Sequence, residues 1–297
     1  MASTGILFTI LTAVLWSGVA AGYRKAGKSG TSLLSLGLLI SSLVALISIL
    51  IALPSLQTGF NRDRLFTLVV MMAASGMTSQ CAMIMMARAM DIGHSAITWV
   101  ITQSAIAVSF LYSIFFLNQT AQLHHTTGLV LLMLSFVFHA RKKKRDSEVS
   151  PGNSIRWVLL TVLSFGFIGA SQCLILTISS WQDMGAEAHL RIPVSFFSAA
   201  CLFAILCLSR KKYPNRSTLK FGLPMAAIVS GGQFTLFIAA DRLAATNLSS
   251  IVFPVAIGGS ILGFSLISRF FFKEHFTKRT WAGIALNTIA IILLAIT

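Results

Sequence analysis

Four glutamines lie inside long apolar stretches of the sequence: Gln80, Gln103, Gln172 and Gln233. An amide side chain both donates and accepts hydrogen bonds, so it can bind a neutral or zwitterionic solute. Gln80 and Gln233 each follow a Met-Ala-Ala triplet, at 72–74 and 225–227, with a constant offset of 153 residues. Hydrogen bonding between helices is the alternative use of such amides. We expect Gln80 and Gln233 to lie on opposite sides of one pseudo-symmetric binding site.

Aromatic side chains share predicted helix faces with these amides. Trp99 lies four residues before Gln103 and Phe237 lies four after Gln233, spacings that place both members of each pair on one face. Such faces predict a pocket that encloses an organic solute, including a cation held against ring faces. Anchoring at a membrane surface is the alternative for tryptophans at the ends of apolar stretches. The predicted substrate-binding set is Trp16, Gln80, Trp99, Gln103, Gln172, Gln233 and Phe237.

Few charged residues border the apolar stretches. Glu187 and Arg191 form an i, i+4 pair at a predicted helix start. Arg191 could bind a substrate carboxylate and Glu187 could take a proton, or the two form a structural pair at a membrane surface. Pro254, inside an apolar stretch, frees a backbone carbonyl and permits bending. The predicted gating or coupling set is Tyr23, Arg88, Asp91, Glu187, Arg191, Asp241 and Pro254.

Signals for catalysis or metal binding are weak. His124 and His125 are adjacent and so do not share a helix face. The sequence holds no His-Glu-x-x-His and no Gly-x-Ser-x-Gly motif. All four cysteines lie inside apolar stretches, which argues against a disulfide framework. We expect no metal and no cofactor, and an intramembrane enzyme is the least favoured class of protein.

The elements that must position these residues are ten apolar segments. Charged side chains make up 10% of the 297 residues, where a soluble domain carries about a quarter. All the charged side chains fall outside the ten apolar segments. Each of these segments is long enough to cross a hydrocarbon layer about 30 Å thick. We therefore predict an all-α integral membrane protein, with a first helix that is retained rather than cleaved. The predicted spans are 5–22, 33–53, 65–87, 94–117, 124–140, 157–180, 192–209, 221–240, 247–268 and 280–296.

The net charge is +15, and the basic residues that produce it are distributed unevenly among the connections between the predicted spans. The connections that follow the first, third, fifth, seventh and ninth spans carry 19 of the 23 Lys and Arg residues, including the run 141–145. The positive-inside rule then places these connections in the cytoplasm and both termini outside. The basic residues are expected to contact anionic lipid head groups rather than nucleic acid.

The connection 141–156 divides the chain into two similar halves, 1–140 and 157–297, of five spans each. Residues 115–119 match 270–274, and Gly128 matches Gly283, both at an offset of 155. Because each half has an odd number of spans, the second enters the membrane from the opposite side. Inverted repeats of this kind are typical of alternating-access carriers, with the substrate site near the midplane.

The sequence resembles the EamA-type drug/metabolite transporter superfamily. The stretch 13–18, Ala-Val-Leu-Trp-Ser-Gly, followed by Lys25, is similar to the opening motif of that family. Pro254, Lys273-Glu274 and Gly283 are similar to its second-half signature, and Arg191 stands where the family often has an arginine. The first half departs from the pattern, with Gln119 in place of the usual glutamate. The resemblance implies a ten-helix bundle that moves a small metabolite without hydrolysing a nucleotide.

The sequence therefore favours a secondary transporter for an amino acid, an amine or a related metabolite. We expect it in a bacterial cytoplasmic membrane, with lipids and the substrate as its partners. The fifth and tenth spans carry few polar side chains, so they are expected at the periphery, where they could form a homodimer contact. A non-transporting membrane scaffold or lipid-binding protein is the alternative.

Overall fold

The computed structural model describes residues 2–54, 62–93, 95–117, 122–140, 151–179, 181, 186–244 and 252–296. These residues form helices and connecting turns and contain no strand, so the predicted all-α class is confirmed. The helices are α1 Ala2–Lys28, α2 Leu33–Ala52, α3 Arg62–Ile92, α4 Ser95–Gln103, α5 Ile106–Phe116, α6 Leu123–Ala140, α7 Pro151–Ser179, the short 3-10 helix η2 Ala186–Leu190, α8 Arg191–Arg210, α9 Arg216–Ala244, α10 Val252–Phe270 and α11 Lys278–Ala295.

Seven helical stretches among the described residues are long and apolar enough to cross a membrane. They are Ser3–Lys28, Leu33–Ala52, Arg64–Ile92, Ser95–Phe116, Ile155–Ile178, Glu187–Ser209 and Arg216–Ala239. Shorter apolar helices cover Leu123–Ser135 and Val255–Phe270. Helices also cover the other predicted segments, but the number of ten spans remains a prediction.

The fourth predicted segment is broken rather than continuous. A turn at Ser104 and Ala105 separates α4 from α5, although neither residue is Gly or Pro. The hydroxyl of Ser104 donates to the Val100 carbonyl at 2.7 Å, and the Asn287 amide of α11 donates to the Ser104 hydroxyl at 2.6 Å. A contact with a distant helix therefore accompanies this break.

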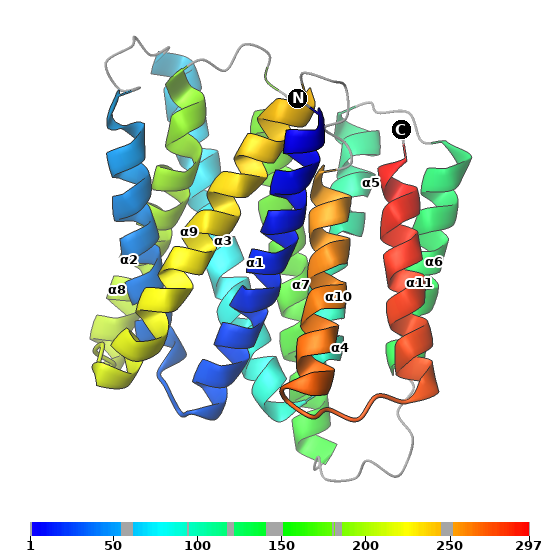
Figure 1. The fold of residues 1–297 in the computed structure, drawn as a ribbon. Helices are drawn as coiled ribbons and strands as arrows, with labels where there is room; N and C mark the ends of the chain where they lie inside the picture. Colours follow the sequence, from blue (N-terminus) through cyan, green and yellow to red (C-terminus); the bar gives the residue numbers. More distant parts are fainter. Residues whose placement is uncertain are drawn as a thin grey trace.

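The helices stand side by side in one bundle, with both termini at the same end (Figure 1). We call this the terminal end and the opposite one the basic end. Helix α1 packs against α9 and α10, while α3 packs against α7 and α8. Helix α2 lies against α8 and α9, and α6 pairs with α11 at one edge of the bundle. The most extensive contacts thus join the first half of the chain to the second.

Small residues allow α1 to lie close to two neighbours. A Cβ atom added to Gly22 would stand 2.9 Å from the Met225 side chain of α9. On another face of α1, Ala13 lies close to Gly259 of α10. A Cβ atom added to Gly259 would stand 2.8 Å from the Cβ atom of Ala13. Glycines at these two positions therefore allow close packing between helices.

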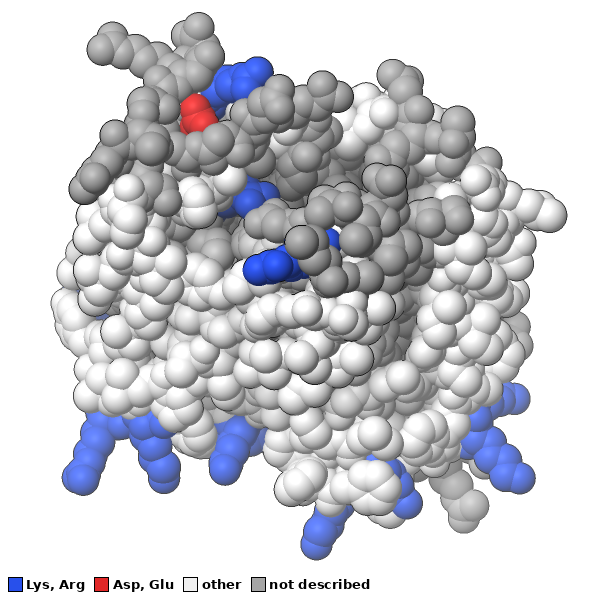
Figure 2. Space-filling view, turned by 45° about the horizontal axis from the view of Figure 1, so that its top comes forward, with Lys and Arg blue, Asp and Glu red and all other residues white. Residues whose placement is uncertain are grey.

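Charge and apolar surface occupy different parts of the molecule. Exposed Lys and Arg side chains gather along the lower rim in Figure 2, at the basic end, where α8 ends at Arg210 and its connection to α9 begins with Lys211 and Lys212. Between the ends, large apolar side chains face outward, among them Leu7, Val14, Leu50, Phe66 and Leu159, each more than half exposed. Water opposes such exposure, whereas lipid tails do not.

Candidate functional site

A cavity lies between the first and second halves of the chain, enclosed by α3, α7, α8 and α9. Its empty volume is about 400 Å³, part of which is open to solvent. The cavity lies between the middle of the bundle and the terminal end, because α8 begins there and contributes its first two turns. The lining residues are Met72, Ser75, Gly76, Ser79, Gln80, Ser171, Ile175, Arg191, Ile192, Ser195, Phe196, Gln233 and Phe237.

The two glutamines related by the offset of 153 residues both line this cavity. Gln80 comes from α3 and Gln233 from α9, so each half of the chain supplies one amide. Phe237, one turn after Gln233, lines the cavity as well. The structure thus brings together three members of the predicted substrate-binding set.

Arg191 gives the cavity a positive charge. It is the first residue of α8, and its Nε–H donates to the Ala188 carbonyl at 2.9 Å. Its guanidinium carbon stands 4.3 Å from the centre of the Phe237 ring, a cation–π contact. Glu187, four residues earlier on η2, is only 8% exposed but is not among the lining residues.

Serine hydroxyls join the walls of the cavity. The hydroxyls of Ser75 on α3 and Ser171 on α7 lie 2.8 Å apart and share a hydrogen bond. Ser195 of α8 donates to the Met72 carbonyl of α3 at 3.1 Å. Gly76 packs directly on the Ser195 backbone carbonyl, with no room for a Cβ atom. Sequence reasoning missed these residues, although Met72, Ser75 and Ser79 follow one another at spacings of three and four residues and so share a helix face.

Other members of the predicted substrate-binding set lie outside the cavity. Trp99 is 2% exposed and packs edge-on against Phe264 of α10, with ring centroids 5.7 Å apart. Trp16 packs in the apolar core beside Gly232 of α9. Gln103 is buried at the end of α4, and Gln172 of α7 is half-buried. The cavity is therefore built without these four side chains.

The predicted gating residues are scattered along the bundle. Tyr23 is buried in a large apolar cluster that also holds Phe196 and Phe203. Arg88 is exposed, whereas Asp91 is half-buried at the end of α3. Asp241 lies in α9 and Pro254 in α10, but their side chains lie outside the described residues.

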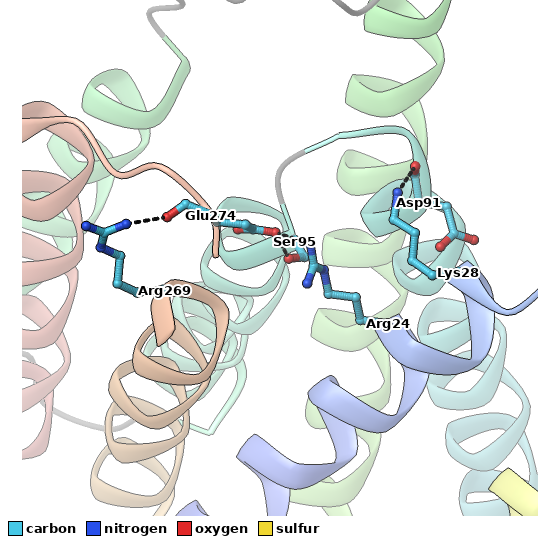
Figure 3. Close-up of polar contacts among 6 residues, drawn as sticks. All are labelled: Arg24, Lys28, Asp91, Ser95, Arg269 and Glu274. Carbon is cyan, nitrogen blue, oxygen red and sulfur yellow. Dashed lines mark hydrogen bonds and ion pairs between the residues drawn. The ribbon is translucent and has the colours of Figure 1, made fainter. Parts of the chain in front are cut away.

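A second polar cluster, which we call the basic-end cluster, consists of Arg24, Lys28, Asp91, Ser95 and Glu274 (Figure 3). Arg24 of α1 pairs with Glu274, in the connection before α11, at an N–O distance of 2.7 Å. Ser95 of α4 donates to the same carboxylate. The Lys28 ammonium donates to the Asp91 carbonyl at 3.0 Å. The cluster therefore ties together α1, α3, α4 and the α10–α11 connection.

The Arg24–Glu274 pair of this cluster is largely shielded from solvent. The Arg24 and Glu274 side chains are 12% and 9% exposed, and the Arg24 guanidinium also lies 3.9 Å above the Phe272 ring. Arg269 donates to the Glu274 backbone carbonyl at 3.3 Å. Sequence reasoning did not select Arg24 or Glu274, although Glu274 is one of only eight acidic residues. Charges held at such low exposure require partners.

Sequence reasoning also overlooked one motif match. Residues 22–29 read Gly-Tyr-Arg-Lys-Ala-Gly-Lys-Ser, which fits the phosphate-binding pattern Gly-x4-Gly-Lys-Ser/Thr. That pattern forms a phosphate cradle only in a loop between a strand and a helix. Here residues 22–28 are the last turns of α1, and the lysine of the motif binds the Asp91 carbonyl. The segment is therefore a helix end and not a nucleotide site.

Among the described residues, no group of three or more His, Cys, Asp or Glu side chains suits a metal ion. No protein-family model matches this sequence, and no curated protein matches it either.

Proposed function

We propose that the protein is a membrane-embedded secondary transporter that moves a small organic metabolite by alternating access. One observation carries the proposal: a cavity that receives one glutamine from each half of the chain lies toward one end of the bundle, and the Arg24–Glu274 ion pair joins helices at the other end. A pocket lined by apolar side chains with a few convergent polar groups is the usual form of a small-molecule site. Lipid surrounds the apolar sides of the bundle in this proposal.

The pattern of helix contacts supports ten spans arranged as two inverted repeats. If 1–140 and 157–297 are equivalent, α1 corresponds to α7, α2 to α8 and α3 to α9. The contact of α3 with α7 then corresponds to that of α9 with α1, and α3–α8 corresponds to α9–α2. The contacts of α2 with α8 and of α6 with α11 each correspond to themselves. This two-fold pattern also favours membership of the EamA-type drug/metabolite transporters.

The proposal includes an orientation. The basic end faces the cytoplasm by the positive-inside rule, so both termini and the cavity side face outward. The structure then corresponds to a state closed toward the cytoplasm. Conversion to the state that is open toward the cytoplasm requires the residues of the basic-end cluster to separate. The Arg24–Glu274 ion pair opposes this separation. A bacterial cytoplasmic membrane and a homodimer through α6 and α11 belong to the same proposal.

A thermal-shift screen of the detergent-solubilised protein against a metabolite library tests the function. A ligand that binds only the folded protein raises its apparent stability. We expect any such ligand to lose its effect in Gln80→Ala and Gln233→Ala and to keep it in Gln103→Ala. Gln103→Ala is the matched control, because it removes a buried amide outside the cavity.

Flux distinguishes a transporter from its alternatives. Proteoliposomes should take up the ligand, and Gln233→Ala should abolish that uptake while Gln103→Ala leaves it unchanged. A repetition with and without a proton gradient identifies proton coupling. Ligand binding without any uptake would instead support a scaffold or lipid-binding protein, and chemical conversion of the ligand would support an enzyme.

A further inference from the structure

The polar groups that line the cavity divide into two kinds. Those of the first kind are already engaged with the protein. The hydroxyls of Ser75 and Ser171 share a hydrogen bond, and Ser195 donates to a backbone carbonyl of α3. The Arg191 guanidinium is engaged as well, by a backbone carbonyl and an aromatic ring. None of these groups needs a ligand to complete its contacts.

Two amides and one hydroxyl form the second kind. Gln80, Gln233 and Ser79 line the cavity, and Gln80 is only 7% exposed. Within the part of the chain that the structure describes, these three side chains make no hydrogen bond. Buried polar groups are nearly always hydrogen-bonded, because burial removes them from water. A shielded amide that borders a cavity and has no partner in the described protein therefore indicates a ligand.

A glutamine amide offers two different atoms to a ligand. Its oxygen accepts hydrogen bonds and its nitrogen donates them. A carboxylate only accepts and an ammonium only donates, so either group leaves one atom of the amide unpaired. An unpaired polar atom is costly where exposure is as low as it is at Gln80. The free amides therefore favour an uncharged group that both donates and accepts.

Carboxamides, ureas and lactams, which we call amide-type groups, meet this requirement better than alcohols do. A hydroxyl has its donor and its acceptor on one oxygen, so it pairs with one atom of a glutamine at a time. An amide-type group has an N–H donor and a carbonyl acceptor on neighbouring positions, as glutamine itself has. Glutamine forms a two-bond pair of this kind with the neighbouring donor and acceptor of adenine. An amide-type group therefore satisfies both atoms of one glutamine at once.

The remaining side chains suit the body of such a ligand. Met72, Ile175, Ile192 and Phe196 contribute apolar surface to the cavity from α3, α7 and α8. Small-molecule sites commonly combine apolar walls with a few polar groups that fix the orientation of the ligand. The lining thus favours an organic molecule that has an apolar part beside its polar group.

We infer that the substrate is an uncharged organic molecule with an amide-type group, and that Gln80 binds this group through a pair of hydrogen bonds. The inference rests on the proposed transport function. Gln80 is assigned this role because it is the more shielded of the two free glutamines. Gln233 and Ser79 then bind further polar atoms of the substrate. Simple amines and carboxylates do not belong to this class.

The test compares ligands that share one ring and differ in one group. Benzamide, N,N-dimethylbenzamide, methyl benzoate, benzoate and benzylamine are each titrated into the detergent-solubilised protein in a thermal-shift assay. The dimethylamide and the ester keep the carbonyl acceptor but lack the N–H donor. We expect benzamide to bind about 10- to 100-fold more tightly than the other four, because each of them leaves a buried atom unpaired. The matching cyclohexane compounds repeat the comparison without an aromatic ring.

Variants then assign the preference to Gln80. Gln80→Leu removes both hydrogen-bonding atoms, so benzamide and methyl benzoate should bind it about equally. Without ligand, its melting temperature should stay the same or rise, whereas it would fall if the amide joined two helices. Gln103→Leu is the matched control, because Gln103 is also 7% exposed but lies outside the cavity. It should keep the full preference for benzamide.

Several outcomes would overturn the inference and leave the transporter standing. They are equal binding of benzamide and methyl benzoate, tighter binding of benzoate or benzylamine, and no binding by any member of either series. A preference for benzamide that survives Gln80→Leu, or a lower melting temperature of this variant without ligand, would also overturn it. Uptake of hits from the metabolite library judges transport separately. Benzamide binding through Gln80, with no uptake of any amide-type hit, would overturn the transporter and leave the ligand class standing.

Discussion

The two ends of the bundle are held together by different kinds of contact. Around the cavity, toward the terminal end, the helices are joined by neutral hydroxyl bonds such as Ser75–Ser171 and by direct backbone contact at Gly76. At the basic end, neutral contacts such as Thr31–Ser217 are joined by charged ones that involve the long side chains of Arg24, Lys28 and Glu274. Short neutral contacts fix a distance between helices, whereas long charged side chains can separate and be solvated. If the protein alternates its access as proposed, the basic end is therefore the part that we expect to open.

The largest effect is expected from breaking the charged end. Glu274→Gln removes the carboxylate that accepts from both Arg24 and Ser95, and each lost hydrogen bond to a charged group costs about 1.5–3 kcal/mol. We expect faster amide hydrogen exchange in the last turns of α1 and unchanged exchange in residues 72–80 of α3. Hydrogen exchange followed by mass spectrometry measures both segments in one sample.

A double variant is the control for Glu274→Gln. Arg24→Gln combined with Glu274→Gln removes both charges, so it should be more stable than Glu274→Gln alone. If exchange increased equally at both ends of the bundle, the proposed difference between them would be wrong.

A smaller effect is expected at the cavity wall. Gly76→Ala places a methyl group against the Ser195 backbone carbonyl, and overpacking of this kind costs about 1–3 kcal/mol. Gly27→Ala is the matched change at the basic end, where the added methyl meets the Asp91 side chain. Thermal unfolding in detergent should show the larger loss for Gly76→Ala, because a side chain can move aside and a helix backbone cannot.

Gly166→Ala serves as the reference for both glycine substitutions, since an added Cβ at Gly166 meets nothing within 4 Å. It should be neutral or slightly stabilising, by up to about 1 kcal/mol, because alanine favours helix. Equal melting temperatures for the variants at 27, 76 and 166 would contradict the distinction between a rigid wall and a movable end.

The smallest effect is expected from the neutral hydroxyl pair. Ser75→Ala removes the contacts of the Ser75 hydroxyl with the Ser171 hydroxyl and carbonyl, and hydrogen bonds between helices in membranes contribute about 0.6 kcal/mol each on average. The melting temperature should therefore fall by a few degrees at most. A loss as large as that of Glu274→Gln would show that the cavity wall depends on its hydrogen bonds and not on packing.

The sequence predicted the helices well because their signal is local. Apolar segments free of charge specify helices without reference to any neighbour, and small residues such as Gly22 and Gly259 indicate where helices approach. The pairing of Gln80 with Gln233 could also be predicted, since an internal repeat carries information about long-range symmetry. The helices and the repeat can be predicted because both are patterns along the chain, and neither requires knowledge of contacts between distant segments.

The remaining features depend on contacts that leave no local signal. Helical spacing correctly placed Trp99 and Gln103 on one face, but it does not state which neighbour that face meets, and Trp99 meets Phe264. Arg24 and Glu274 are 250 residues apart, so the local sequence around either residue does not predict that they form a pair. The break at Ser104 has no Gly or Pro beside it and instead coincides with a contact from Asn287.

The pairing of α6 with α11 has a consequence for how the chain is made. Helix α6 completes the first half, yet its most extensive contact is with the final helix of the second half. During synthesis, α6 must therefore wait, without its main partner, until almost all of the protein has been produced. Assembly of the first half finishes only when the last helix arrives, so a ribosome that stops after α10 releases a chain whose earlier half is also incomplete.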